Sequence, residues 1–184
     1  LRVEGPVGSL ITHGSIALEK GLLRLENLET PFAFDALNLV IDADRARLTS
    51  HGGTAAAGRW EAKGTAVLHN AAIDSFAVEF VLQNTPLIMA RVFDVRGGGQ
   101  LRWHGTAESS RLEGTFAIDR GIISAPVNLR ASAHMPPPTF ASSAVWKKNT
   151  TLAVALKMQN VQLQNDLMDM VIDSDLGLAG NAAH

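Results

Sequence analysis

Cysteine is absent from this 184-residue sequence. The chain therefore cannot form disulfides, thiolate zinc sites or a cysteine nucleophile. An excess of positive charge is absent too, because 16 lysine and arginine residues face 18 aspartate and glutamate residues, for a formal net charge of −2. Nucleic-acid binding relies on a basic stripe or patch, so this balance argues against nucleic acid as a partner.

The sequence also lacks an apolar run of about twenty residues, the length that a membrane-spanning helix needs. It starts at Leu1 without a methionine or a secretory signal. We therefore expect a piece of a longer protein, with any anchor or targeting segment lying outside it. The length suits a single domain, residues 1–184, that is large enough to bury a core.

Catalytic and metal-binding motifs are missing as well. There is no G-x-S-x-G and no H-E-x-x-H, and the stretch at residues 53–59 lacks the Lys-Ser/Thr pair of a phosphate loop. The six histidines have no ligand spacing, and the aspartates at residues 166–175 lack the spacing and glycine of a calcium loop. We therefore predict a protein that is not an enzyme and uses no metal or cofactor.

What the sequence does contain is apolar residues at every second position. Between residues 100 and 121, for example, they alternate with charged residues, and glycines share the apolar phase. Period two is typical of strands with one apolar face. The alternation predicts strands at residues 1–5, 16–25 with a break at Lys20-Gly21, 37–41, 60–68, 76–82, 101–105, 112–118, 127–129 and 152–158.

Glycines and one helical pattern interrupt the predicted strands. Glycine-containing stretches at residues 51–53, 97–99 and 119–121 predict turns. Residues 87–95, next to Pro86, are the one helix candidate, because their apolar residues fit a helical stripe.

The last part of the chain contains a phase change and a long loop. After Met158 the apolar residues move from even to odd positions at Gln159-Asn160, which a β-bulge or tight turn explains. Three consecutive prolines exclude a central strand at residues 133–149 and predict a loop there. The Trp146-Lys-Lys sequence near its end is compatible with an ordinary surface loop or with a contact to lipid headgroups.

A short pattern, apolar-x-apolar-x-Gly, occurs four times and ends at Gly5, Gly64, Gly105 and Gly180. Glycine on the apolar face of a strand weakens packing, unless the sheet must bend strongly or another surface must come close. The residues alone leave two arrangements open. One is a sandwich or closed barrel with a dry core, and the other is an open trough filled by a ligand.

Three stretches carry a resemblance to a known family. The first is residues 21–41, which begin Gly-Leu-Leu-Arg-Leu-Glu-Asn-Leu, and the second is residues 96–126, which contain Gly-Gly-Gly-Gln-Leu-Arg-Trp-His-Gly-Thr. The third is the end of the chain, residues 152–163 and the Asp-Leu-Gly-Leu-Ala-Gly at 175–180. Together they resemble the C-terminal part of the TamB family, and the resemblance covers nearly the whole chain. AsmA-like proteins share the same style of sequence.

The resemblance implies a fold and a function. The fold is all-β: an elongated, strongly curved antiparallel or mixed sheet that forms an open, taco-like trough with a hydrophobic concave face. The function is that of a periplasmic groove protein of the translocation and assembly module in Gram-negative bacteria. Such proteins assist assembly of outer-membrane proteins and autotransporters, and phospholipid transport between the inner and outer membranes. The full-length protein would be anchored in the inner membrane.

The implied partners are a TamA-like (BamA-like) outer-membrane barrel and, in the groove, phospholipid or unfolded outer-membrane protein. The alternative is a structural β-domain, such as an adhesin or passenger module, with a closed dry core. Exposed sheet edges would also allow an edge-to-edge homodimer. No catalytic residue carries over, and we expect the hydrophobic groove to be lined by Trp60, Leu68, Phe76, Val78, Phe80, Leu101, Trp103, Phe116, Ile118, Leu129, Leu152, Val154, Leu156, Met158, Leu176 and Leu178.

Overall fold

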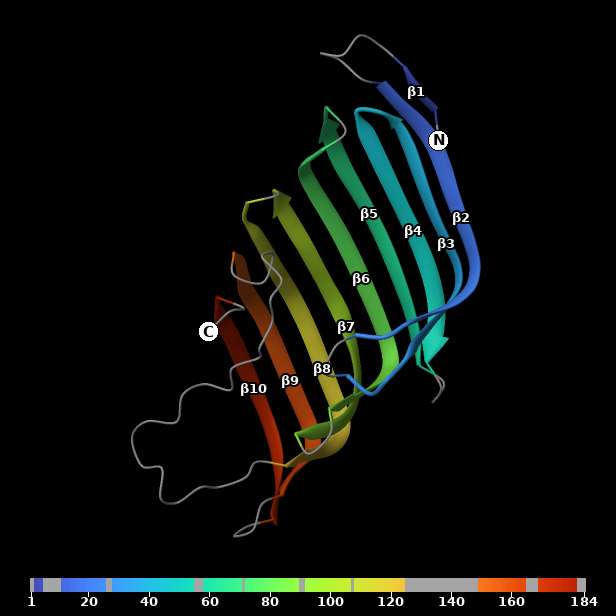
Figure 1. Cartoon of the computed structure of the whole chain (residues 1–184). Helices are drawn as coiled ribbons and strands as arrows, with labels where there is room; N and C mark the ends of the chain where they lie inside the picture. Colours follow the sequence, from blue (N-terminus) through green and yellow to red (C-terminus); the bar gives the residue numbers. More distant parts are fainter. Residues whose placement is uncertain are drawn as a thin grey trace.

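The structure is a computed structural model, and its described residues form a single mixed β-sheet of ten strands (Figure 1). The described residues are 2–4, 11–25, 28–54, 58–70, 72–89, 92–106, 108–124, 149–164 and 169–181. The strands are β1 (Arg2–Glu4), β2 (Ile11–Leu23), β3 (Phe32–Ala43), β4 (Arg45–Thr54), β5 (Arg59–His69), β6 (Ala72–Met89), β7 (Phe93–Thr106), β8 (Ser110–Ser124), β9 (Thr150–Gln164) and β10 (Asp169–Asn181).

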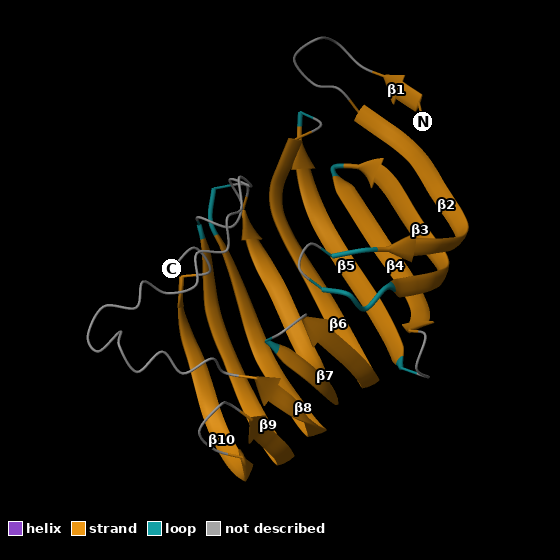
Figure 2. Cartoon of the chain, turned by 60° about the horizontal axis from the view of Figure 1, so that its bottom comes forward, coloured by secondary structure: helices purple, strands orange, loops and turns teal. Residues whose placement is uncertain are grey.

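The strands lie in the sheet in the order in which they follow along the chain. Each pairs antiparallel with its neighbour except β8 and β9, which are parallel. β1 and β10 are the two edges, so the sheet is open (Figure 2). The expected all-β mixed sheet is therefore confirmed, and the described residues form no second sheet and no closed arrangement.

The connection from β2 to β3 ties this end of the sheet to a distant strand. It passes the lower ends of β4 and β5 in Figures 1 and 2 and reaches the end of β6. There the Glu29 amide donates to the carbonyl oxygen of Ile88 at 2.8 Å, and the Ile88 amide donates to Thr30 Oγ1 at 3.1 Å. Thr30 is buried by this contact. The connection between β2 and β3 is thus hydrogen-bonded to the end of β6.

The bulge predicted at Gln159-Asn160 is confirmed. Asn160 has a φ of 51°, and its amide donates to Asp173 Oδ1 at 2.6 Å. The β9–β10 register shifts here, with Met158 opposite Ser174 and Val161 opposite Ile172. Because the bulge adds one residue, the odd-numbered Val161 faces the same side of the sheet as the even-numbered Met158.

Bulges restore the side-chain phase in other strands as well. Lys20 in β2 and Asn84 in β6 have φ values of 55° and 48°, and the β7–β8 register shifts next to Asp119. The break predicted at Lys20-Gly21 is therefore a change of phase within one strand. Each bulge keeps the apolar residues on both sides of it pointing to one face.

The helix predicted at residues 87–95 is wrong. β6 continues to Met89 and β7 begins at Phe93, with Leu87 paired to Val95. The Val92 amide donates to the Met89 carbonyl oxygen at 3.0 Å, which closes a tight turn between the two strands. Leu87 and Ile88 belong to β6 and Val95 to β7, so the spacing that imitated a helical stripe spans two paired strands.

The turns predicted at residues 51–53, 97–99 and 119–121 are also wrong, because these residues lie within β4, β7 and β8. A Cβ on Gly97 would overlap the carbonyl oxygen of Ala117 in the neighbouring strand, and one on Gly99 would overlap that of Thr115. These glycines therefore allow strands to approach each other. The strand predicted at 127–129 and all of the 133–149 loop except Asn149 lie outside the described residues.

Candidate functional site

One side of the sheet carries rows of apolar residues and glycines, in which Ser50 is the one polar member of the two rows described below. Paired residues in neighbouring strands point to the same side, so the pairing register defines which residues share a row. Two adjacent rows cross nine strands, from β2 to β10, and we call the side that they define the apolar face. The first row is Leu18, Leu37, Ser50, Ala62, Phe80, Leu101, Gly114, Val154 and Leu178, and the second is Ile16, Leu39, Leu48, Gly64, Val78, Trp103, Leu112, Leu152 and Gly180.

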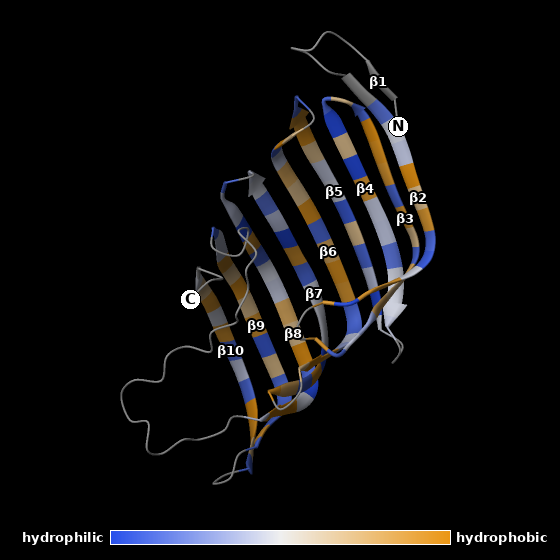
Figure 3. Ribbon diagram, viewed as in Figure 1, coloured by the Kyte–Doolittle hydropathy of each residue, from blue (hydrophilic) through white to orange (hydrophobic). Residues whose placement is uncertain are grey.

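The predicted groove residues fall on this face. Leu129 lies outside the described residues, and the other fifteen of the sixteen share one side of the sheet. They come from β5 to β10, and the rows continue through β2, β3 and β4 as well. Figure 3 shows apolar and polar residues alternating along these strands. The structure thus brings the predicted residues together on one surface.

Most buried apolar side chains of the described residues lie on the same side. A cluster of Val95, Phe116, Ile118, Met158 and Val161 is buried at the lower end of β7 to β9, and Val161 is 0% exposed. The remaining buried apolar side chains of the described residues, Phe32, Ala46 and Ala62, also lie on the apolar face. Pro86 is the exception among the described residues, because it is buried and its pairing with Arg96 places it on the opposite side. One end of the apolar face is therefore a packed core.

Towards both sheet edges the apolar face is open. Leu18 in β2 is 49% exposed, and Leu178 in β10 is 46% exposed. Extensive strand contacts join only sheet neighbours, and within the described ranges no helix or second sheet packs on this face. A large exposed apolar surface of this kind marks a site for another apolar partner.

Two pairs of aromatic rings on the apolar face are held in defined orientations. Phe76 and Trp103 pack edge to face, with ring centroids 4.8 Å apart, and Phe32 and Trp60 do the same at 6.4 Å. Trp60 Nε1 donates to the carbonyl oxygen of Ala33 at 2.9 Å, so the ring is held across β4. Such pairs favour one ring orientation and stiffen the surface.

Two glycines of this face, Gly21 and Gly114, allow neighbouring strands of the sheet to approach closely. Gly114 has a φ of +141°, and a Cβ there would overlap the carbonyl oxygen of Gln100 in β7. At Gly21 an added Cβ would overlap the ring of Phe34 in β3. Of the two reasons that the sequence offered, close approach of another surface thus applies, and the approaching surface is the neighbouring strand.

The opposite side of the sheet is polar and has alternating charge. Lys63, Glu79, Arg102 and Glu113 form one row across β5 to β8, so opposite charges are neighbours. Glu113 accepts a 2.9 Å hydrogen bond from Arg111 Nε, and its other oxygen lies 3.2 Å from His104 Nε2. The charged side chains of this side are suited to contact with water.

Two groups on the polar side have shifted pKa values. Partial loss of solvent acts to raise the pKa of Glu113, but the Arg111 hydrogen bond and the nearby His104 and Arg111 charges together hold it below its ordinary value. The hydrogen bond and charge of Glu61, 2.8 Å from Lys63 Nζ, raise the pKa of Lys63. Both shifts favour the charged forms, as a surface network requires.

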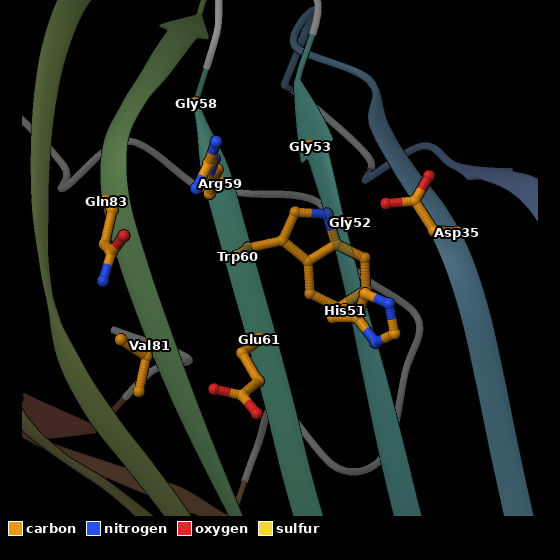
Figure 4. Close-up of a pocket in the computed structure, with 10 residues that line it drawn as sticks. All are labelled: Asp35, His51, Gly52, Gly53, Gly58, Arg59, Trp60, Glu61, Val81 and Gln83. Carbon is orange, nitrogen blue, oxygen red and sulfur yellow. The ribbon is translucent and has the colours of Figure 1, made fainter.

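A hollow of about 620 Å³ lies mainly on the polar side and is wide open (Figure 4). Asp35, His51, Arg59 and Glu61 project around it, so charges of both signs line it. No group of three metal-ligating side chains occurs within the described part of the chain. Among those same residues, no helix is long and apolar enough to cross a membrane. The hollow therefore offers no single ligand chemistry, and the apolar face remains the candidate site.

In comparisons with known proteins, no family model, no curated protein and no solved structure matches the chain.

The prediction from the sequence missed part of the apolar face. The predicted groove omits Ile16, Leu18 and Leu39, although the alternation in residues 16–25 and 37–41 was visible. It also omits Val95, which was assigned to the predicted helix, and Val161, which follows the phase change at Gln159-Asn160. β4 was not predicted as a strand, since small residues such as Ala46 and Ser50 occupy its apolar phase.

Proposed function

We propose that this chain is a segment of a TamB-like periplasmic protein, and that its apolar face holds acyl chains of phospholipids during transport between two membranes. The observation that supports this most directly is the continuity of the apolar rows over nine strands, with exposed leucines at both ends. The resemblance of the sequence to the TamB family motivates the location, the TamA-like partner and the role in assembling outer-membrane proteins.

The energetics of an acyl chain fit such a surface. Each methylene transferred to water costs about 0.8 kcal/mol, so a sixteen-carbon chain costs on the order of 12 kcal/mol. An uninterrupted apolar surface offsets most of this cost, while the charged headgroup remains in water along the open side. The rows contain no charged side chain that would hold a headgroup at one position. Lipid can therefore move along the face.

Neighbouring residues with opposite orientations provide the test. A photocrosslinking amino acid is placed at Leu18, Leu101 or Leu178 on the apolar face, and at Glu19, Arg102 or Ala179 on the polar side. Each control is adjacent in the chain to its test position, so expression and local fold are matched. After irradiation in cells, adducts are identified by mass spectrometry.

The proposal predicts phospholipid adducts at the three leucine positions and few at the controls. Adducts to outer-membrane proteins at the same positions would show that the face shelters unfolded protein and carries no lipid. If the folded protein forms no adduct at any of the three leucines, the face is a dry core, and the structural β-domain is the correct interpretation.

A further inference from the structure

Two adjoining hollows lie on the polar side of the sheet, over the interior strands β4 to β7. The first has a volume of about 340 Å³, and its polar lining includes Arg45, Arg47, Thr65, Ser75 and Ala77. The second, of about 370 Å³, shares Arg47, Thr65 and Ala77 with the first and is also lined by Lys63, Glu79 and Arg102. We call the two together the cationic hollow. It shares no lining residue with the hollow in Figure 4.

Short side chains create this space. Thr65 in β5 and Ala77 in β6 are opposite each other, and Arg47 in β4 is the next residue of their row. Residues that are opposite each other in neighbouring strands have their Cβ atoms about 5 Å apart. Two short side chains beside a long one therefore leave a depression that the Arg47 side chain borders.

Positive charge predominates around the cationic hollow. Its lining contains four cationic side chains and one carboxylate, that of Glu79. One of the four cations, Lys63, is already paired with Glu61, whose carboxylate oxygen lies 2.8 Å from Lys63 Nζ. The other three are arginines.

These arginines have no anionic partner among the described residues. No carboxylate of those residues lies within ion-pair distance of Arg45, Arg47 or Arg102. Asp42 in β3 is opposite Arg45, but its carboxylate is paired with His13 at 2.9 Å. Three guanidinium groups thus have donors available for a ligand.

A phosphate group is the anion that fits this arrangement. A guanidinium offers parallel N–H donors that match phosphate oxygens, and the hydroxyl groups of Thr65 and Ser75 add donors to the same space. A phosphate monoester has three acceptor oxygens, so it can use several of these donors at once. We propose that the cationic hollow binds one phosphate group, either of a soluble phosphate ester or of a phospholipid headgroup at a membrane surface.

The cationic hollow is separated from the apolar face by the sheet itself. β4 to β7 are hydrogen-bonded to a neighbour on both edges, so the headgroup of a lipid on the apolar face cannot pass between them. Arg47 and Leu48 are adjacent in β4 and point to opposite sides. The phosphate therefore belongs to a molecule other than the one on the apolar face, and the proposal does not rest on lipid transport.

Two probes distinguish the sources of the phosphate. Glycerol 3-phosphate is added to the isotope-labelled 184-residue chain in about 0.15 M salt, and amide shifts are followed by nuclear magnetic resonance. The shifts should be largest around Thr65 and Ala77, and neutral glycerol should cause none. In parallel, cosedimentation is measured with phosphatidylglycerol vesicles and with phosphatidylcholine vesicles as the control.

Matched variants locate the binding. Arg47→Gln should weaken it about tenfold, because a charge-assisted bidentate contact is lost. Arg120→Gln removes the same charge from an exposed position of β8 outside the cationic hollow and should leave the affinity unchanged. Glu79→Gln removes the one carboxylate of the lining and should tighten binding about twofold to threefold. All three side chains are exposed, so urea unfolding of each variant should match that of the parent chain.

Each outcome bears on the proposal. Binding of glycerol 3-phosphate without vesicle binding would support it with a soluble ester as the ligand. Binding of phosphatidylglycerol vesicles that Arg47→Gln weakens would support it with a headgroup as the ligand. No binding of either probe would overturn it, and so would equal weakening by Arg47→Gln and Arg120→Gln, which would reflect net charge alone. Vesicle binding that Arg47→Gln does not change, without binding of glycerol 3-phosphate, would also overturn it.

Discussion

Replacement of Gly114 by alanine should destabilise the sheet far more than the same replacement at Gly177. Gly114 lies in the middle of β8, on the apolar face, with a φ of +141°. Backbone in this region costs a residue with a Cβ about 1–3 kcal/mol. The added methyl would also overlap the carbonyl oxygen of Gln100, and moving that backbone costs about another 1–3 kcal/mol. The free energy of unfolding should therefore fall by about 2–6 kcal/mol.

Urea unfolding followed by tryptophan fluorescence measures this loss, because Trp103 lies in the strand that pairs with Gly114. With an m-value of about 2 kcal/mol/M, the midpoint should fall by roughly 1–3 M. Gly177→Ala is the control, since nothing lies within 4 Å of its Cβ position, and its change should stay within about 0.5 kcal/mol. Equal stability of the two variants would refute the assignment of Gly114 as a point of close strand approach.

Two further predictions concern the packed core and the polar side. Val161→Ala should lower the free energy of unfolding by about 2 kcal/mol in a urea titration, because Val161 is 0% exposed. Val171→Ala, 62% exposed, is its control, and similar losses in both would contradict the one-sided core. Since the pKa of Glu113 is lower in the folded state than its ordinary 4.5, its carboxylate stabilises the fold above that pH and loses this effect as the pH falls further. The stability gap to Glu113→Gln should therefore be constant near neutral pH and shrink below about pH 4.5, and a gap unchanged in acid would contradict the network.

The apolar face could be predicted from the sequence because side-chain direction in a strand depends only on position along the chain. Leu101, Trp103, Phe116 and Ile118 alternate with charged residues, so no knowledge of strand pairing is needed to place each pair on one side. The bulge at Asn160 could be predicted for the same reason. An uncorrected change of phase would expose Val161 and Leu163 on the polar side, and the structure avoids this.

Strand pairing itself could not be predicted. Nothing in the local sequence of β8 or β9 distinguishes a parallel neighbour from an antiparallel one, because both arrangements have the same side-chain period. The runs at 51–53 and 97–99 were misread for a related reason. Glycine is typical of turns and equally of strands whose neighbours come close, and only the partner strand decides between the two.

The bulges and the glycines together explain why the apolar face is continuous. A long strand that follows a twisted, bent sheet needs irregular positions, and each irregular position threatens to turn the next apolar residue to the polar side. Lys20, Asn84 and Asn160 absorb the extra residue in a left-handed conformation, which asparagine tolerates better than most residues. Gly114 and Gly121 then let neighbouring strands approach on that face. An ordinary dry core needs burial at each point but not unbroken rows from one sheet edge to the other. Continuous rows across the sheet are what the proposed movement of acyl chains along the apolar face requires.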